Sequence, residues 1–298
     1  MRYLDPKADL TFKRVFGEHP DLAVSLLNAL LPLEAGGEIA EVEYLPAELV
    51  PETPLRKNSI VDVRCRDARG RQFIVEMQMV WSPEFRQRVL FNASKAYVRQ
   101  NDSGEDYHLL QPVYSLNLVN EVFEPDLEEY YHYYRLVHVE HTDRVIEGLH
   151  LVFVELPKFT PHTYTERKMQ ALWLRYLTEI NDKMVKVPED LLVNPAVKKA
   201  VEVLEKSSFT SAQLLGYEKF WDAVSVERTL YNSGERKGKA EGFAEGKEEG
   251  FQEGLEKGRR EVKQNQIETA RALKSLGVAT DIIAKSTGLA LDEIAGLD

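Results

Sequence analysis

The sequence lacks the features of a secreted, disulfide-bonded or membrane-spanning protein. Among its 298 residues there is one cysteine, Cys65, so neither a disulfide framework nor a cysteine-rich zinc site can form. No apolar run approaches the roughly 18 residues that a transmembrane helix needs. The first ten residues, MRYLDPKADL, lack the basic and apolar regions of a signal peptide. We therefore expect a cytoplasmic protein with no membrane association.

The sequence also lacks an excess of positive charge. Its net charge of −11 at pH 7 opposes nonspecific binding to the phosphates of nucleic acid. This charge does not exclude a nuclease, because a basic groove can be local and bound cations offset acidic sites. The hydrophobic content of 43% is that of an ordinary globular protein, and the length allows one large domain or two ordinary ones.

Hydrophobic periodicity predicts an α/β fold in the first part of the chain. Apolar residues recur at helical spacing over 9–31, where Asp9 is a candidate N-cap and His19-Pro20 divides the helix into two pieces. The helix over 83–101 is predicted to link the third and fourth strands of an α-β-β-β-α-β order with extra strands, which describes a mixed sheet. The other expected elements are a strand over 39–49, a loop over 51–58, a hairpin over 59–80, and strands over 112–123, 129–141 and 149–159.

The predicted hairpin brings two carboxylates together. If its turn runs from Asp67 to Arg71, with Gly70 in the left-handed conformation, Asp67 pairs with Arg71 and, farther along, Asp62 faces Glu76. Their Cβ atoms would then lie roughly 5 Å apart. Carboxylates so close share a proton or bind a cation, and Mg²⁺ and Mn²⁺ prefer carboxylate oxygens. Such an ion can polarise a phosphoryl oxygen and supply a hydroxide nucleophile.

A second interpretation of the hairpin involves no metal. Asp62 and Glu76 can belong to an exposed polar face, where they pair with Arg64 and with nearby lysines. A one-residue change in the turn would also shift the register and separate the two carboxylates. The local pattern leaves both interpretations open.

Five segments in the same order resemble one nuclease family over roughly residues 5–160. The resemblance is to the Rpn family of recombination-promoting nucleases, also labelled transposases, within the PD-(D/E)XK nuclease superfamily. It implies a restriction-endonuclease-like core and a metal-dependent DNA endonuclease that hydrolyses phosphodiester bonds in DNA recombination or in mobile-element or phage-related processes. The segments are DLTFKRVFG (9–17), IVDVRC (60–65), FIVEMQ (73–78), EFRQRVLFNASKAYVRQ (84–100) and GEDYHLLQPVYSLNLV (104–119).

The resemblance assigns roles to four residues. Asp62 and Glu76 become the ligands of Mg²⁺ or Mn²⁺, Gln78 takes the place of the motif lysine, and Asp9 matches an acidic position that could assist the metal through water. The chain departs from the superfamily pattern at Val61, where the motif has proline, and at Gln78. A neutral amide can orient the attacking water, but it cannot neutralise charge that develops on the phosphate.

Basic residues near this motif could supply the missing charge or bind DNA. Lys13 and Lys95, on neighbouring helices, are candidates for the charge that the motif lysine would carry. Arg88, Lys95 and Arg99 are spaced by seven and four residues, so they share one helix face and are candidates for DNA phosphate contacts. The alternative is that they form the charged outer face of an amphipathic helix.

The sequence after the nuclease-like region, 1–160, is predicted to have three parts. These are a helical extension over 161–231, a charged helix with repeated glycines over 232–264, and a helix-turn-helix-like end over 265–298 with Gly288 at its turn. The glycines recur every four residues from Gly234 to Gly258, and each costs an isolated helix about 1 kcal/mol relative to alanine. Packing against a copy, giving a homodimer or higher homo-oligomer, competes here with a flexible linker. The last helix has no basic residue, which favours packing over reading DNA bases.

Two functions from other classes compete with the endonuclease. One is a catalytically weak or inactive nuclease-fold protein that binds DNA or regulates, which the missing lysine and the acidic charge favour. The other is an oligomeric scaffold built on the glycine repeat, in which the hairpin carboxylates are ordinary surface.

Overall fold

The computed structural model of the chain describes residues 2–49, 59–100, 106–161 and 168–297. The loop expected over 51–58, and the expected start of the helices near residue 165, lie outside these residues. The chain divides into two compact units, Met1–Arg228 and Thr229–Asp298, and each is described by itself.

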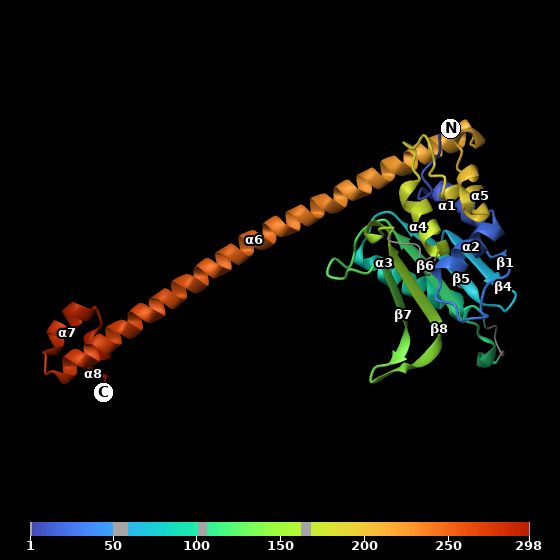
Figure 1. Cartoon of the computed structure of the whole chain (residues 1–298). Coiled ribbons are helices and arrows are strands. Elements are labelled where there is room, and N and C mark those ends of the chain that lie inside the picture. Colours follow the sequence, from blue (N-terminus) through green and yellow to red (C-terminus); the bar gives the residue numbers. More distant parts are fainter. Residues whose placement is uncertain (1, 50–58, 101–105, 162–167, 298) are drawn as a thin grey trace. The chain divides into compact units, whose positions relative to one another are not determined.

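A six-stranded mixed sheet forms the centre of the first unit (Figure 1). Its order is β1-β4-β5-β6-β8-β7, in which β5, β6 and β8 are parallel neighbours and the remaining pairs are antiparallel. Helix α3, Pro83–Val98, connects β5 to β6. The predicted α/β class and the mixed sheet are therefore confirmed. The strands are β1 Val42–Tyr44, β4 Val63–Asp67, β5 Gln72–Gln78, β6 Val113–Val119, β7 Tyr131–His138 and β8 His141–Glu155.

Helices cover both faces of this sheet. Successive side chains of a strand point to opposite faces, so one strand contributes to the apolar core on each side. On β5, Phe73 and Val75 join the large core with α1, α2, α4 and α5, whereas Ile74 packs toward α3. His19-Pro20 separates α1 from α2, as expected. The helices are α1 Asp9–Gly17, α2 Pro20–Leu30, α4 Lys168–Glu179 and α5 Pro195–Val203, with short 3₁₀ turns at Tyr107–Leu109, Leu156–Lys158, Leu191–Val193 and Lys206–Ser208.

Three local expectations are wrong. The N-cap of α1 is Ala8, and Asp9 is the first helical residue, where its carboxylate lies near the positive end of the helix dipole. The single strand expected over 39–49 is two pieces, β1 and β2 (Glu48–Leu49), and β2 pairs with β3 (Ser59–Ile60) in a separate small sheet. Strand β8 begins eight residues before its expected start, because it continues the hairpin with β7 that extends beyond the other strands (Figure 1).

Helix α6, Ser211–Ser275, begins in the first unit and continues into the second. In the first unit its apolar side chains, Tyr217, Phe220 and Trp221 among them, pack against Leu4 and Ala8. In the second unit the glycine repeat is helical throughout. No helix in the described part of the chain is long and apolar enough to cross a membrane.

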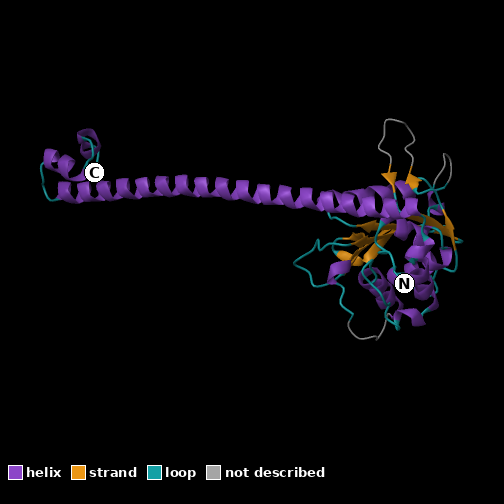
Figure 2. Cartoon of the chain, turned by 90° about the horizontal axis from the view of Figure 1, so that it is seen from above, coloured by secondary structure: helices purple, strands orange, loops and turns teal. Residues whose placement is uncertain are grey.

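Two short helices fold back on the end of α6 in the second unit (Figure 2). They are α7, Thr280–Thr287, and α8, Leu291–Ala295. Gly288 ends α7 with a φ of 74°, a left-handed conformation that glycine adopts without strain. Ile283 and Ile294 pack against Ala270 of α6, so the three helices share a small apolar core.

Candidate functional site

The hairpin has the register that its turn predicts. Val63 pairs with Val75, and the turn between the strands contains Gly70 with a φ of 82°. The paired residues end at Val63 and Val75, so the expected pair of Asp62 with Glu76 is not formed as a strand pair. The side chains of Asp62 and Glu76 nevertheless line the same cleft.

The first of these positions lies just outside the strand. Strand β4 begins at Val63, because the chain before it turns away and the N–H of Val61 donates to the carbonyl of Ala47 at 3.1 Å. The carboxylate of Asp62 then accepts a hydrogen bond from the N–H of Met77 through Oδ2, at 2.8 Å. This contact fixes the Asp62 side chain against β5, beside Glu76, without a strand pair.

The pKa values of both carboxyl groups are raised. Glu76 is only 7% exposed, and burial together with the charge of Asp62 raises the pKa of Glu76 to about 7. The Arg88 charge and a hydrogen bond from Asn92 oppose this rise. Burial also raises the pKa of Asp62, against the opposing effect of the Met77 N–H. A site with two such groups gains stability from any cation that lets both ionise.

Lys13 links the first helix to the acidic pair. Its Nζ lies 2.5 Å from Oδ1 of Asp9 and 3.8 Å from Oδ1 of Asp62. Asp9 is thus connected to the pair through an ammonium group. Arg64, by contrast, donates to Gln72 at 2.8 Å, so the expected alternative in which Arg64 neutralises the pair is not the arrangement found.

The basic residues of α3 diverge. Arg88 donates through Nη2 to Oε1 of Gln78 at 2.6 Å, beside the carboxylates. Lys95 donates to the carbonyl of Leu49 in β2, away from them. Arg99 is the C-cap residue, where the helix ends. Of the three residues expected on one DNA-binding face, the structure brings only Arg88 to the acidic pair.

Asn92 is a site residue that the sequence reasoning missed. It lies on α3, is 1% exposed, and donates through Nδ2 to Oε1 of Glu76 at 3.1 Å. Its Oδ1 is buried and has no hydrogen-bond partner among the described residues. The signal for it was available: Phe85, Val89 and Ala96 are buried at helical spacing, and position 92 continues that series with a polar side chain.

A cleft of about 640 Å³ lies between β5 and α3, and its lining includes Asp62, Glu76, Gln78, Arg88 and Asn92. Three carboxylates line it, those of Asp62, Glu76 and Glu84, and Arg88 is the one basic side chain on its described wall. The described residues contain no cluster of three or more acidic, histidine or cysteine side chains suited to a metal. Mg²⁺, however, is commonly held by one or two carboxylates, with water and substrate phosphates as its other ligands. The donor set therefore fits such an ion.

Comparison with known proteins decides the family. Residues 6–226 match the family model described as PD-(D/E)XK nuclease family transposase. The chain belongs to this family. The expected resemblance is thereby confirmed, and the match continues past residue 160 through α4, α5 and the start of α6. No curated protein and no solved structure matches the chain. The nuclease family generally uses divalent metals, which agrees with the carboxylate pair.

Proposed function

We propose that this member of the nuclease family is a metal-dependent DNA endonuclease, acting in the cytoplasm in DNA recombination or in mobile-element or phage-related processes. Asp62 and Glu76 would hold Mg²⁺ or Mn²⁺, and Asp9 would assist from α1. The observation that carries the proposal is the pair itself: two carboxylates line one cleft, and the charge of Asp62 adds to the burial that raises the pKa of Glu76 to about 7.

The charge of the cleft supports this proposal. With three carboxylates and one guanidinium on its wall, the cleft without a cation attracts a phosphodiester only weakly, through Arg88. A bound divalent ion would strengthen that attraction, polarise the phosphoryl oxygen and lower the pKa of a water nucleophile. The protein's own part is to hold the two carboxylates in place: β5 fixes Glu76 beside Asn117 of β6, and the Met77 N–H orients Asp62.

A plasmid assay tests the proposal. Supercoiled plasmid is incubated with the wild-type protein and with Asp62→Ala, in EDTA and over a titration of Mg²⁺ and of Mn²⁺. We expect nicking by the wild type only with metal, and at least a hundredfold loss in the variant. Glu84→Gln is the matched control, because it removes a carboxylate from the same cleft but not from the pair. Equal nicking by wild type and Asp62→Ala would contradict the assignment.

Two observations favour a second function, that of a catalytically weak DNA-binding or regulatory protein. Gln78 occupies the position of the motif lysine, and Lys13 already lies 3.8 Å from the Asp62 carboxylate, where it competes with a metal ion. Such a protein would bind DNA in the same assay and leave the plasmid supercoiled at every metal concentration.

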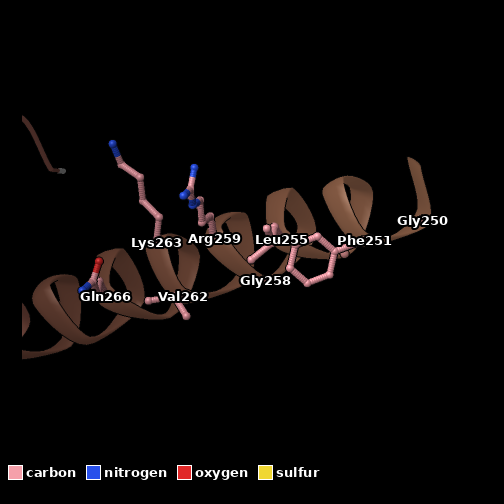
Figure 3. A pocket seen from close by; sticks show the side chains of 9 residues that line it. Gly250, Phe251, Leu255, Gly258, Arg259, Val262, Lys263 and Gln266 are labelled. Atoms are coloured by element: carbon pink, nitrogen blue, oxygen red, sulfur yellow. The ribbon is translucent and has the colours of Figure 1, made fainter. Parts of the chain in front are cut away.

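Self-association through the second unit is also part of the proposal. A Cβ placed on any glycine from Gly234 to Gly258 would meet no other side chain and no distant backbone within 4 Å, so nothing in the described chain packs against the repeat. Figure 3 shows Phe251, Leu255 and Val262 exposed along the same part of α6. A second copy of this helix could approach closely at the glycines and cover these apolar side chains. A homodimer would suit cleavage of both strands of a duplex.

A further inference from the structure

The amide of Gln78 is engaged at both ends. Its Oε1 accepts from Nη2 of Arg88 at 2.6 Å, and its Nε2 donates to the carbonyl of Val80 at 2.5 Å. The Val80 contact sets the amide orientation, so that the oxygen and not the nitrogen faces Arg88. A group held in this way is suited to fixing its neighbour in place.

The neighbour that it fixes, Arg88, makes no close ion pair among the described residues. Lys13, by contrast, pairs with Asp9, and Arg86 pairs with Glu124. The Arg88 guanidinium carbon also lies 4.8 Å from the centre of the Phe85 ring, which restrains it from a second side. Arg88 uses one N–H group in the hydrogen bond to Gln78, and its remaining N–H groups can donate to a phosphate.

Arg88 lies in the same cleft as the acidic pair, Asp62 and Glu76, and its Nη2 lies 2.6 Å from Oε1 of Gln78. It is also the one basic side chain on the described wall of the cleft. An anion that enters to reach the carboxylates and their cation therefore meets Arg88.

We propose that Arg88 is the phosphate-binding cation of this site, in the place of the motif lysine, and that Gln78 is a positioning residue that holds it there. The ligand is a phosphodiester of the DNA backbone. This inference rests on the proposed endonuclease function and changes the role of Gln78 from orienting water to orienting a guanidinium. The positive charge of the site then lies on α3 instead of at the motif position on β5, and the Gln78 amide holds it in place.

The first experiment measures DNA binding without metal. A labelled duplex is titrated in EDTA at several salt concentrations with the wild type, Arg88→Ala, Gln78→Ala and the control Arg86→Ala, after thermal melts confirm that each is folded. Loss of one phosphate contact lowers the slope of the logarithm of the binding constant against the logarithm of the salt concentration by about one. We expect this for Arg88→Ala alone, because Gln78→Ala leaves the charge present and Arg86 already pairs with Glu124.

The second experiment measures nicking with metal present. We expect Gln78→Ala and Arg88→Ala each to lower kcat by about 10- to 100-fold, as loss of a transition-state donor does. The double variant is expected to be no slower than Arg88→Ala, since Gln78 acts only through Arg88. Gln78→Lys in the Arg88→Ala background is expected to restore at least part of kcat, because it returns a charge to the motif position.

The outcomes separate this inference from the nuclease proposal. Additive losses in the double variant, or equal effects of Arg86→Ala and Arg88→Ala, overturn the inference while nicking by the wild type stands. If the wild type binds DNA but never nicks it, the nuclease proposal fails, and the salt dependence in EDTA still decides whether Arg88 binds phosphate. A wild type that neither binds nor nicks DNA overturns both.

Discussion

The side chain of Asp62 occupies the place of a strand partner for Met77. Its Oδ2 accepts the Met77 N–H at 2.8 Å, where a continued β4 would have offered a main-chain carbonyl. Strand β4 begins only at Val63, because the N–H of Val61 donates to the carbonyl of Ala47 instead. One carboxylate therefore has two tasks, since it completes the hydrogen bonding of β5 and it contributes half of the acidic pair.

These two tasks can be separated by substitution. Asp62→Asn keeps an acceptor for the Met77 N–H but removes the charge, whereas Asp62→Ala removes both. We expect Asp62→Ala to lose about 1–3 kcal/mol of unfolding free energy, and Asp62→Asn to stay close to the wild type. Both should lose Mn²⁺ binding in a calorimetric titration. Equal melting temperatures for the two variants would mean that the hydrogen bond does not stabilise the fold.

The stability of the metal-free protein should fall as the pH rises. The folded-state pKa of Glu76, about 7, lies above its usual value of 4.5, so folding favours the protonated form. This contribution is complete below pH 4.5 and is lost as the pH passes through 7; its size is on the order of 3 kcal/mol. Urea unfolding in EDTA at pH 5.5 and pH 8 measures it.

Two comparisons make this pH effect specific. Glu76→Gln should remove the Glu76 part of the dependence, while Glu84→Gln, in the same cleft, should retain it. Mg²⁺ should recover stability at pH 8 in the wild type, because a cation stabilises the ionised pair. A Glu76→Gln profile that matches the wild type would contradict the coupling between burial, Asp62 and Glu76.

Asn92 is expected to set the balance between stability and metal affinity. Asn92→Ala removes the donor to Glu76 and leaves a small cavity, which should cost about 1–3 kcal/mol. Asn92→Asp places a third carboxylate beside the pair, so the protein should be less stable than the wild type in EDTA and gain more stability on adding Mn²⁺. Thermal melts with and without the ion give both quantities. An Asn92→Asp variant that is indifferent to Mn²⁺ would argue against a metal at this position.

The glycine repeat allows a test in which two effects have opposite signs. Changing Gly250, Gly254 and Gly258 to alanine should strengthen the helix by about 1 kcal/mol for each residue. If copies of α6 approach closely at the glycines, the same changes weaken self-association of the full chain. Sedimentation velocity measures the outcome, with Glu249→Ala and Glu253→Ala as controls. Unchanged or tighter association in the alanine variant would exclude close packing at the repeat.

The sequence predicted the parts of the site that follow from local rules. The turn at Gly70 set the register of β4 and β5, and that register brings the chain before Val63 close to Glu76. The helix break at Pro20 and the helix α3 also follow from local sequence patterns. These features depend on neighbours in the chain and need no knowledge of distant contacts.

The parts that were missed depend on contacts between distant segments. The first residue of β4 is set by the hydrogen bond from Val61 to Ala47, fourteen residues earlier in the chain, and no local pattern predicts this contact. Lys95 shares a helix face with Arg88, but β2 offers a carbonyl to Lys95 alone. Asn92 was missed for another reason, since its helical spacing was visible and only its polarity hid it among the charged residues of α3.

The two acidic positions are anchored with unequal firmness. Glu76 lies on a strand with neighbours on both edges, whereas Asp62 precedes its strand and depends on where the chain crosses Ala47. Substitutions near that crossing could therefore retune the distance between the carboxylates while the sheet stays intact. The separation of the two carboxylates is thus set by the contact between Val61 and Ala47 outside the strand pair, and not by the sheet itself.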